Sequence, residues 1–234
     1  MGYMFEAKLD PRLRQLDGVI IDTCGLFPRS RTNEFSLQLV GEEIEARARS
    51  CGVGEDFLTA AHTHFDMFED FVYGALDAGK LLIPEWQEAE TIGVSRKIRE
   101  EQVRLPTKLR NRVDSLYDRQ VNLLRAVSSG KTLPKPKVTP ENARYLSLTL
   151  DWLGEDPKAH WNRSRGAEPP SRRDILFAEE FLALSGNGSA IGLVTADRSL
   201  VQIARTAYRM RRDTFYRKEK PPVFNTLYDP RVLH

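Results

Sequence analysis

An α/β fold built on a parallel sheet is predicted by three features of the sequence. Two short apolar runs, 18–21 and 191–194, each contain a glycine and lead to an acidic residue, as buried strands do at the start of the next element. Segments with apolar residues at helical spacing lie between and after these runs. Open parallel sheets carry their sites at the carboxyl ends of their strands, so Asp22 and Asp197 are expected at one edge.

The composition is that of a globular protein whose net charge is close to zero. The 234 residues are 41% hydrophobic and 29% charged, with a net charge of +2, so a nucleic-acid surface has to be local. No apolar run is long enough for a membrane span, and no secretory signal is visible, which predicts no membrane partner. Two cysteines are too few for a disulfide framework or a cysteine zinc site, which favours a reducing cytoplasm.

The first third of the chain is predicted to alternate strands and helices. Apolar residues recur at helical spacing in two segments, 34–50 and 55–78. Gly79 ends the second segment, and 80–84 is expected to be a third short strand. Pro84 suits the first turn of the helix that follows.

The middle of the chain is basic. Residues 94–128 interleave arginine and lysine with apolar residues, which predicts a helical hairpin broken near Pro106 and basic on its outer face. Residues 130–140 are rich in proline and lysine and are expected to be a stiff linker. A helix at 141–153 and an irregular basic loop at 161–170 follow.

The last third returns to the α/β pattern, with helices expected at 174–184 and 198–209 and a final strand at Val223 and Phe224. We therefore expect one discontinuous α/β domain formed by residues 1–93 and 171–234. Residues 94–170 are expected to be an inserted basic helical subdomain.

Each acid of interest has a structural explanation as well as a functional one. Asp197 can cap the helix that follows it, Asp174 completes a capping box with Ser171, and Asp22 can form a turn. Taken together, however, several carboxylates at one sheet edge repel one another unless a cation is present. Oxygen ligands of this kind suit hard divalent ions, so Mg²⁺ or Mn²⁺ is the expected cofactor and a phosphodiester the expected target.

The helix that begins near Pro84 carries two competing acids. Glu88 and Glu90 are separated by about 200° around a helix, so both cannot face one site. Glu90 shares a face with Trp86 and Gly93, which favours Glu90 as the inward residue. The alternative, Glu88, stays open.

The order of these motifs resembles the PIN-domain family of metal-dependent ribonucleases. The resemblance covers residues 17–93 and 171–225. The motifs that carry it are the strand ending in Asp22-Thr23, the Ile83-Pro84 start followed by Glu90, the segment Asp174-Ile175-Leu176 with Ala178, and the segment Thr195-Ala196-Asp197.

The resemblance implies a three-layer α/β/α fold and a divalent-metal-dependent endoribonuclease. It assigns the catalytic and metal-binding acids to Asp22, Glu90, Asp174 and Asp197, and makes Thr23 and Thr195 supporting polar neighbours. Metal-assisted attack of water on the phosphodiester would leave a 5′-phosphate and a 3′-hydroxyl. Cys24 departs from the small polar residue usual in the family, and residues 94–170 are longer than in compact members.

RNA is the expected partner of the basic segments. The residues expected to contact its phosphates are Arg96, Lys97, Arg104, Lys108, Arg163, Arg165, Arg172 and Arg173. Such contacts would make binding salt-sensitive, although a solvated helix face explains the same charges. A homodimer, and an antitoxin or other protein partner, also stay open.

Three other functions are compatible with the same residues. One is a non-catalytic PIN-like module that binds RNA or protein. The second is a structure-specific DNA nuclease of related fold. The third is a protein-only RNase P-like enzyme that processes the 5′ end of tRNA, because some of these join a PIN core to a basic helical hairpin.

Overall fold

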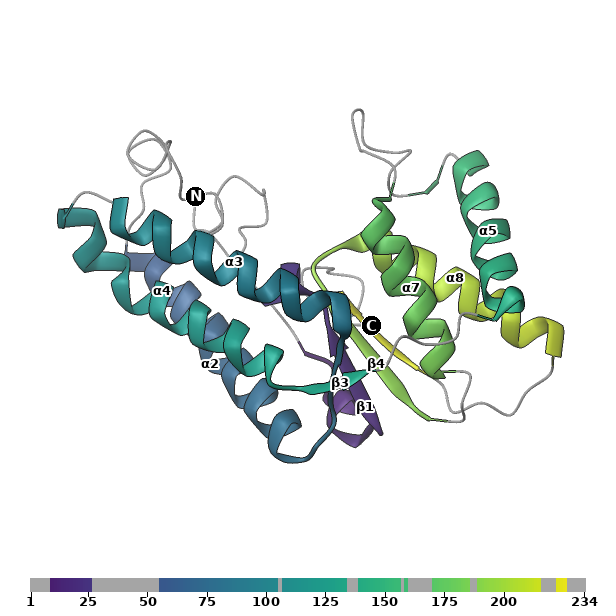
Figure 1. Ribbon diagram of the computed structural model, residues 1–234, viewed down its shortest axis with the longest axis horizontal. Coiled ribbons are helices and arrows are strands. Elements are labelled where there is room, and N and C mark those ends of the chain that lie inside the picture. Colours follow the sequence, from purple (N-terminus) through teal and green to yellow (C-terminus); the bar gives the residue numbers. More distant parts are fainter. Residues whose placement is uncertain are drawn as a thin grey trace.

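The fold is a twisted five-stranded sheet covered on both faces by helices, as the computed structural model shows in Figure 1. The structure describes residues 9–26, 55–104, 107–133, 139–156, 158–159, 170–185, 189–215 and 222–226. The strand order is β3-β2-β1-β4-β5, and every neighbouring pair is parallel. Their bounds are β1 Gly18–Ile21, β2 Leu81–Pro84, β3 Lys131–Leu133, β4 Ile191–Thr195 and β5 Val223–Thr226.

The central strands are buried on both faces. Successive side chains of a strand point to opposite faces, so Val19 and Ile21 of β1 join one apolar cluster while Ile20 joins the other. In β4, Leu193 and Val194 divide between the two clusters in the same way. The near-continuous apolar runs that predicted these strands follow from burial on both sides.

One face of the sheet carries three long helices and two short 3₁₀ helices among the described residues. The helices are α2 Glu55–Asp77, α3 Glu85–Arg104 and α4 Thr107–Ser128, and the 3₁₀ helices are η1 Pro11–Gln15 and η2 Thr23–Leu26. Side chains of α2 and α4, such as Phe68 and Leu124, are buried against β1 and β2. Gly192 lets η1 approach the sheet, because a Cβ atom there would lie 2.6 Å from Leu13 Cδ2 and 2.8 Å from Leu16 Cδ1.

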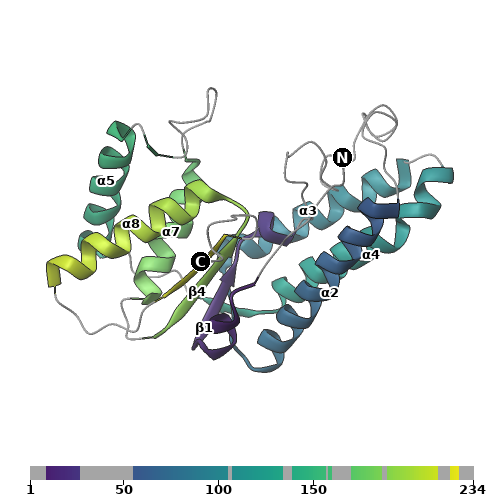
Figure 2. The same ribbon diagram turned by 180° about the vertical axis from the view of Figure 1, so that it is seen from behind.

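The opposite face carries α5 Pro140–Glu155, α7 Arg172–Ser185 and α8 Arg198–Phe215. Phe177, Phe181 and Ile203 are buried in the cluster between these helices and the sheet. The two views in Figures 1 and 2 show α2, α3 and α4 on one side of the strands and α5, α7 and α8 on the other. The α/β class with a parallel sheet is therefore confirmed, and the packing is compatible with the expected three layers.

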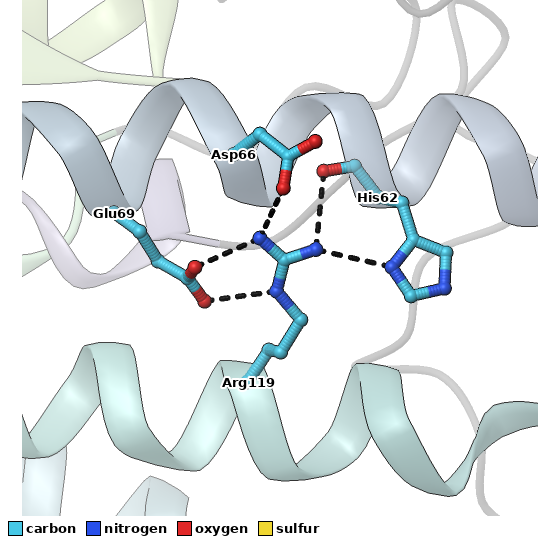
Figure 3. Close-up of polar contacts among 4 residues, drawn as sticks. All are labelled: His62, Asp66, Glu69 and Arg119. Carbon is cyan, nitrogen blue, oxygen red and sulfur yellow. Dashed lines mark hydrogen bonds and ion pairs between the residues drawn. The ribbon is translucent and has the colours of Figure 1, made fainter.

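A charged cluster joins α2 to α4. Arg119 of α4 donates through Nε and Nη2 to the two carboxylate oxygens of Glu69, at 2.9 and 2.8 Å, and through Nη2 to Asp66 at 2.5 Å. Its Nη1 lies 3.0 Å from His62 Nδ1 (Figure 3). The guanidinium also lies over the ring of Phe65. This cluster fixes the register of the two helices.

The middle segment differs in part from the expectation. The helical hairpin is confirmed, because α3 ends at Arg104 and α4 begins at Thr107. The expected linker at 130–140 is wrong at Lys131–Leu133, which is strand β3 and pairs with β2.

Segment 94–170 also contributes to the shared core. The expected boundary at residues 93 and 94 lies within α3, and α4 and α5 each pack into one of the two apolar clusters. The division into a domain and an insertion stays a prediction. The expected helix at 34–50 lies outside the described residues.

In the part of the chain that the structure describes, every helix is too polar or too short to cross a membrane.

Candidate functional site

The carboxyl ends of β1 and β4 lie side by side at the centre of the sheet. Ile21 pairs with Val194, and Asp22 directly follows β1 while Thr195 ends β4. Strand order reverses between these two strands, because the chain builds outward from β1 to β3 on one side and from β4 to β5 on the other. In open parallel sheets such a switch point creates a crevice where ligands bind. We call the surroundings of Asp22, Glu90, Asp174 and Asp197 the acidic edge.

A buried threonine connects two acids of this edge. The Thr195 hydroxyl donates to Asp22 Oδ2 at 2.5 Å and accepts from the backbone N–H of Asp197 at 2.9 Å. Thr195 is fully buried, whereas Asp22 and Asp197 are partly exposed. The hydroxyl therefore donates its proton to the Asp22 carboxylate and accepts the backbone N–H of Asp197 with a lone pair, which fixes the loop after β4 relative to β1.

Asp197 also has the structural role that its position predicted. Its Oδ1 accepts from the backbone N–H groups of Ser199 at 2.6 Å and Leu200 at 3.2 Å. These are two of the N–H groups that the first turn of α8 leaves without a helical partner. The expected helix cap is therefore confirmed. It uses the Oδ1 atom of a side chain that is partly exposed.

Glu90 reaches the same edge from α3. Its Oε2 accepts from the Thr23 hydroxyl at 3.3 Å, and its Oε1 forms an ion pair with Arg173 Nη1 at 2.7 Å. Thr23 follows Asp22 in the sequence, so this contact links Glu90 to the end of β1. Within the described residues, Glu88 makes no side-chain contact of this kind, which favours Glu90 as the inward acid.

Gln87 supports this arrangement and was not predicted from the sequence. It is fully buried one turn before Glu90, and its Nε2 donates to the Ile21 carbonyl at 2.5 Å and to Thr23 Oγ1 at 3.4 Å. These bonds hold the start of α3 against the end of β1. The available signal was a polar residue three positions before Glu90 on the same helix face.

Asp174 lies at the first turn of α7. Its Oδ2 accepts from the Ser171 backbone N–H at 2.7 Å, and its own N–H donates to Ser171 Oγ at 3.3 Å. The predicted capping box is therefore confirmed. Asp174 is next to Arg173 in the sequence and thus adjoins the ion pair with Glu90.

The carboxylates of the four acids are directed to different partners. Among the described residues, no group of three or more His, Cys, Asp or Glu side chains is arranged to hold a metal ion. The contacts instead form two short networks, one through Thr195 and one through Thr23. Asp22 and Thr23, consecutive in the chain, connect them.

A further acid near the start of α3 was missed. Glu180 of α7 is 7% exposed and accepts from Trp86 Nε1 at 3.0 Å, and the Trp86 ring packs edge-on against Phe177. Burial raises the pKa of Glu180 to about 7; the Trp86 hydrogen bond opposes this shift, and Glu179 and Glu85 add to it. In the sequence, Glu179-Glu180 has the pattern of a solvated helix charge, although Phe177 lies one turn away.

The predicted RNA-binding cations lie on several elements. Arg96, Lys97 and Arg104 are exposed on α3, and Arg172 and Arg173 are exposed at the start of α7. The side chain of Lys108, together with Arg163 and Arg165, lies outside the described residues. Among the predicted RNA-binding residues that the structure describes, Arg173 alone contacts an acid of the acidic edge, Glu90.

No protein family, curated protein or solved structure was found to match this chain. The residues of the acidic edge and of the basic helices are therefore the basis for a proposed function.

Proposed function

We propose that the protein is a divalent-metal-dependent endoribonuclease of PIN type whose reaction takes place at the acidic edge. The observation that supports this most lies at the switch point of the sheet, where the Thr195 hydroxyl donates to the Asp22 carboxylate and accepts from the backbone N–H of Asp197. Asp22 and Thr195, which are 173 positions apart in the sequence, are brought together there. If Asp197 served only to cap α8, an acid at position 22 would not be required.

The donor atoms fit Mg²⁺ or Mn²⁺ in kind. Mg²⁺ in enzymes is usually held by one or two carboxylates, while waters and substrate phosphates complete its coordination. Asp22 and Asp197 would supply such a pair, and Glu90 would add a third carboxylate after Arg173 leaves it. When bound, the ion supplies positive charge for the phosphate and lowers the pKa of a water molecule.

The chain's own residues have separate tasks in the proposed reaction. Thr195 holds the Asp22 carboxylate in a fixed orientation, and Thr23, which Gln87 contacts, donates to Glu90. Arg172 and Arg173, both exposed beside the edge, would bind RNA phosphates. Hydrolysis joins the water oxygen to phosphorus and breaks the bond to O3′, which leaves with a proton.

Cleavage of a defined single-stranded RNA by wild type, Asp22→Asn and Asp197→Asn tests the proposal. Asp151→Asn is the matched control, because Asp151 is exposed on α5, a helix that carries none of the four acids. We expect Mn²⁺-dependent cleavage by wild type and control, and a loss of about 100-fold or more in each edge variant. Cleavage that survives both chelator and the edge substitutions would end the proposal.

A non-catalytic RNA-binding module is the second candidate. The observation that favours it is that Asp174, Asp197 and Glu90 each already have a structural partner. In that case the purified protein binds RNA but releases no product with Mn²⁺. A DNA strand of the same sequence and a precursor tRNA, used as parallel substrates, separate the DNA-nuclease and RNase P-like alternatives.

A further inference from the structure

A pocket with three arginines lies between α3 and α4, away from the acidic edge. The two helices are joined by a two-residue connection and lie side by side (Figure 1). Its volume is about 220 Å³. The described residues that line it are Ile92, Ser95, Arg96, Arg99, Val121, Arg125 and Ser128.

Helical spacing explains why these side chains meet. Ile92, Arg96 and Arg99 follow one another at intervals of four and three on α3, so they form a single stripe. Val121, Arg125 and Ser128 repeat those intervals on α4. The two stripes face each other across the helix–helix groove.

The charge of the pocket is strongly one-sided. Among the described lining residues, three are arginines and none is an acid. Arg99 Nη1 contacts Asp118 and also donates to Gln102 Oε1 at 2.8 Å. This leaves further N–H groups on the same guanidinium, which has five. Arg96 and Arg125 are exposed and have no ion pair with the described acids.

The two serine hydroxyls that line the pocket already donate hydrogen bonds within their own helices. Ser95 Oγ donates to the Thr91 carbonyl and Ser128 Oγ donates to the Arg125 carbonyl, both at 2.8 Å. Their protons are therefore used within their own helices. Ile92, 52% exposed, and the buried Val121 add apolar surface beside the guanidinium groups.

We propose that this arginine pocket binds a phosphate group. Guanidinium groups bind phosphate oxygens through two parallel hydrogen bonds, which favours phosphate over a simple halide ion. Pockets for whole drug-sized ligands begin at about 300 Å³, so about 220 Å³ suits a phosphate with part of its sugar. The exposed Ile92 side chain can pack against that sugar or its base.

The pocket is separate from the reaction site. Glu90 and Arg99 are nine positions apart, which is about 180° around an α-helix. The pocket thus opens on the side of α3 opposite to Glu90, about a helix diameter away. If the phosphate belongs to RNA, the strand crosses α3 between pocket and acidic edge. That source of the phosphate rests on the proposed function, whereas the pocket's preference for phosphate does not.

Paired charge-removing variants test the pocket. Arg96→Gln/Arg125→Gln keeps the side-chain stems but removes two charges, and Arg144→Gln/Arg209→Gln removes two exposed charges from α5 and α8. Binding of a labelled oligouridylate is measured by fluorescence anisotropy with chelator at about 50 and about 200 mM salt. Binding of inorganic phosphate is measured by calorimetry.

We expect the pocket variant to bind oligouridylate about tenfold more weakly than the control variant, with a salt slope lower by about 1.4. Loss of inorganic-phosphate binding alone would also support the pocket, with a free anion as its occupant. Equal binding by both variants in both assays would overturn the proposal. Because binding is measured with chelator, the result does not depend on cleavage, and a failed cleavage assay does not affect its interpretation.

Discussion

Arg173 Nη1 lies 2.7 Å from Glu90 Oε1 and joins the first turn of α7 to the second turn of α3. The Arg173 side chain is 69% exposed and that of Glu90 is 22% exposed. The pair is therefore open to solvent on the arginine side, where ion pairs contribute little to stability. A cation or an RNA phosphate that approaches this edge competes directly for one member of the pair.

Arg173→Ala is expected to strengthen Mn²⁺ binding and to weaken RNA binding. Removing the guanidinium frees Glu90 for a cation but deletes a phosphate contact. The free energy of unfolding is expected to change by no more than about 0.5 kcal/mol. Mn²⁺ binding is measured by electron paramagnetic resonance, RNA binding by anisotropy in chelator.

Arg172→Ala is the matched control, because Arg172 is its exposed neighbour on α7. The control is expected to weaken RNA binding without strengthening Mn²⁺ binding. Unchanged or weaker Mn²⁺ binding in Arg173→Ala would show that Glu90 is not a cation ligand.

Thr195→Val is expected to lower both stability and cleavage. Valine has nearly the same shape as threonine but lacks the hydroxyl that Asp22 and the Asp197 N–H share. Leaving these groups without their partner costs about 1–3 kcal/mol. Thr195→Ser keeps the hydroxyl and should recover most of the cleavage. Denaturant titration and RNA cleavage are compared; equal cleavage by the Val and Ser variants would contradict a positioning role.

Glu180 is expected to make the protein less stable as pH rises from about 4.5 to about 7. Its pKa is raised from the ordinary 4.5 to about 7, mainly by burial. In that window the folded chain keeps the proton that the unfolded chain has released, so the free energy of unfolding falls with pH. Below about 4.5 both states are protonated and this loss is absent.

Glu180→Gln should therefore be more stable than wild type at pH 8 by on the order of 2 kcal/mol, but not at pH 4. Glutamine still accepts a hydrogen bond from Trp86 Nε1. Chemical denaturation at both pH values gives the difference, with Glu155→Gln, exposed on α5, as the control. A Glu180→Gln effect that is equal at the two pH values would argue against a buried, protonated acid.

Arg119 is expected to be coupled more strongly to Glu69 than to Asp66. Glu69 receives two hydrogen bonds and its side chain is 27% exposed, whereas Asp66 receives one and is 72% exposed. Double-mutant cycles with alanine should give about 1–2 kcal/mol for Arg119–Glu69 and below about 0.5 kcal/mol for Arg119–Asp66. A larger coupling energy for Arg119–Asp66 than for Arg119–Glu69 would mean that burial does not determine the strength of these ion pairs.

The strands and helices of the described fold were largely predictable from local pattern. β1, β2 and β4 are almost entirely apolar because helices cover both sides of them. Strand β3 was missed because Lys131 and Thr132 are exposed at an edge, and lysine is common on edge strands. Only its pairing with β2 identifies it as a strand.

The acidic edge was predictable in outline but not in its contacts. Chain order placed Asp22 and Asp197 at the ends of strands, and the structure brings both to Thr195. The ion pair of Glu90 with Arg173 could not be foreseen, because it depends on how α3 and α7 approach across the sheet. Whether these acids act on RNA stays a prediction.

The pairing of β1 with β4 also has a consequence for biosynthesis. Asp22 leaves the ribosome early, but its partner Thr195 follows 173 residues later. Sequence-distant strand pairing is slow, because the long intervening loop loses entropy on closure before any contact compensates it. A nascent chain shorter than about residue 197 thus lacks the assembled crevice between β1 and β4.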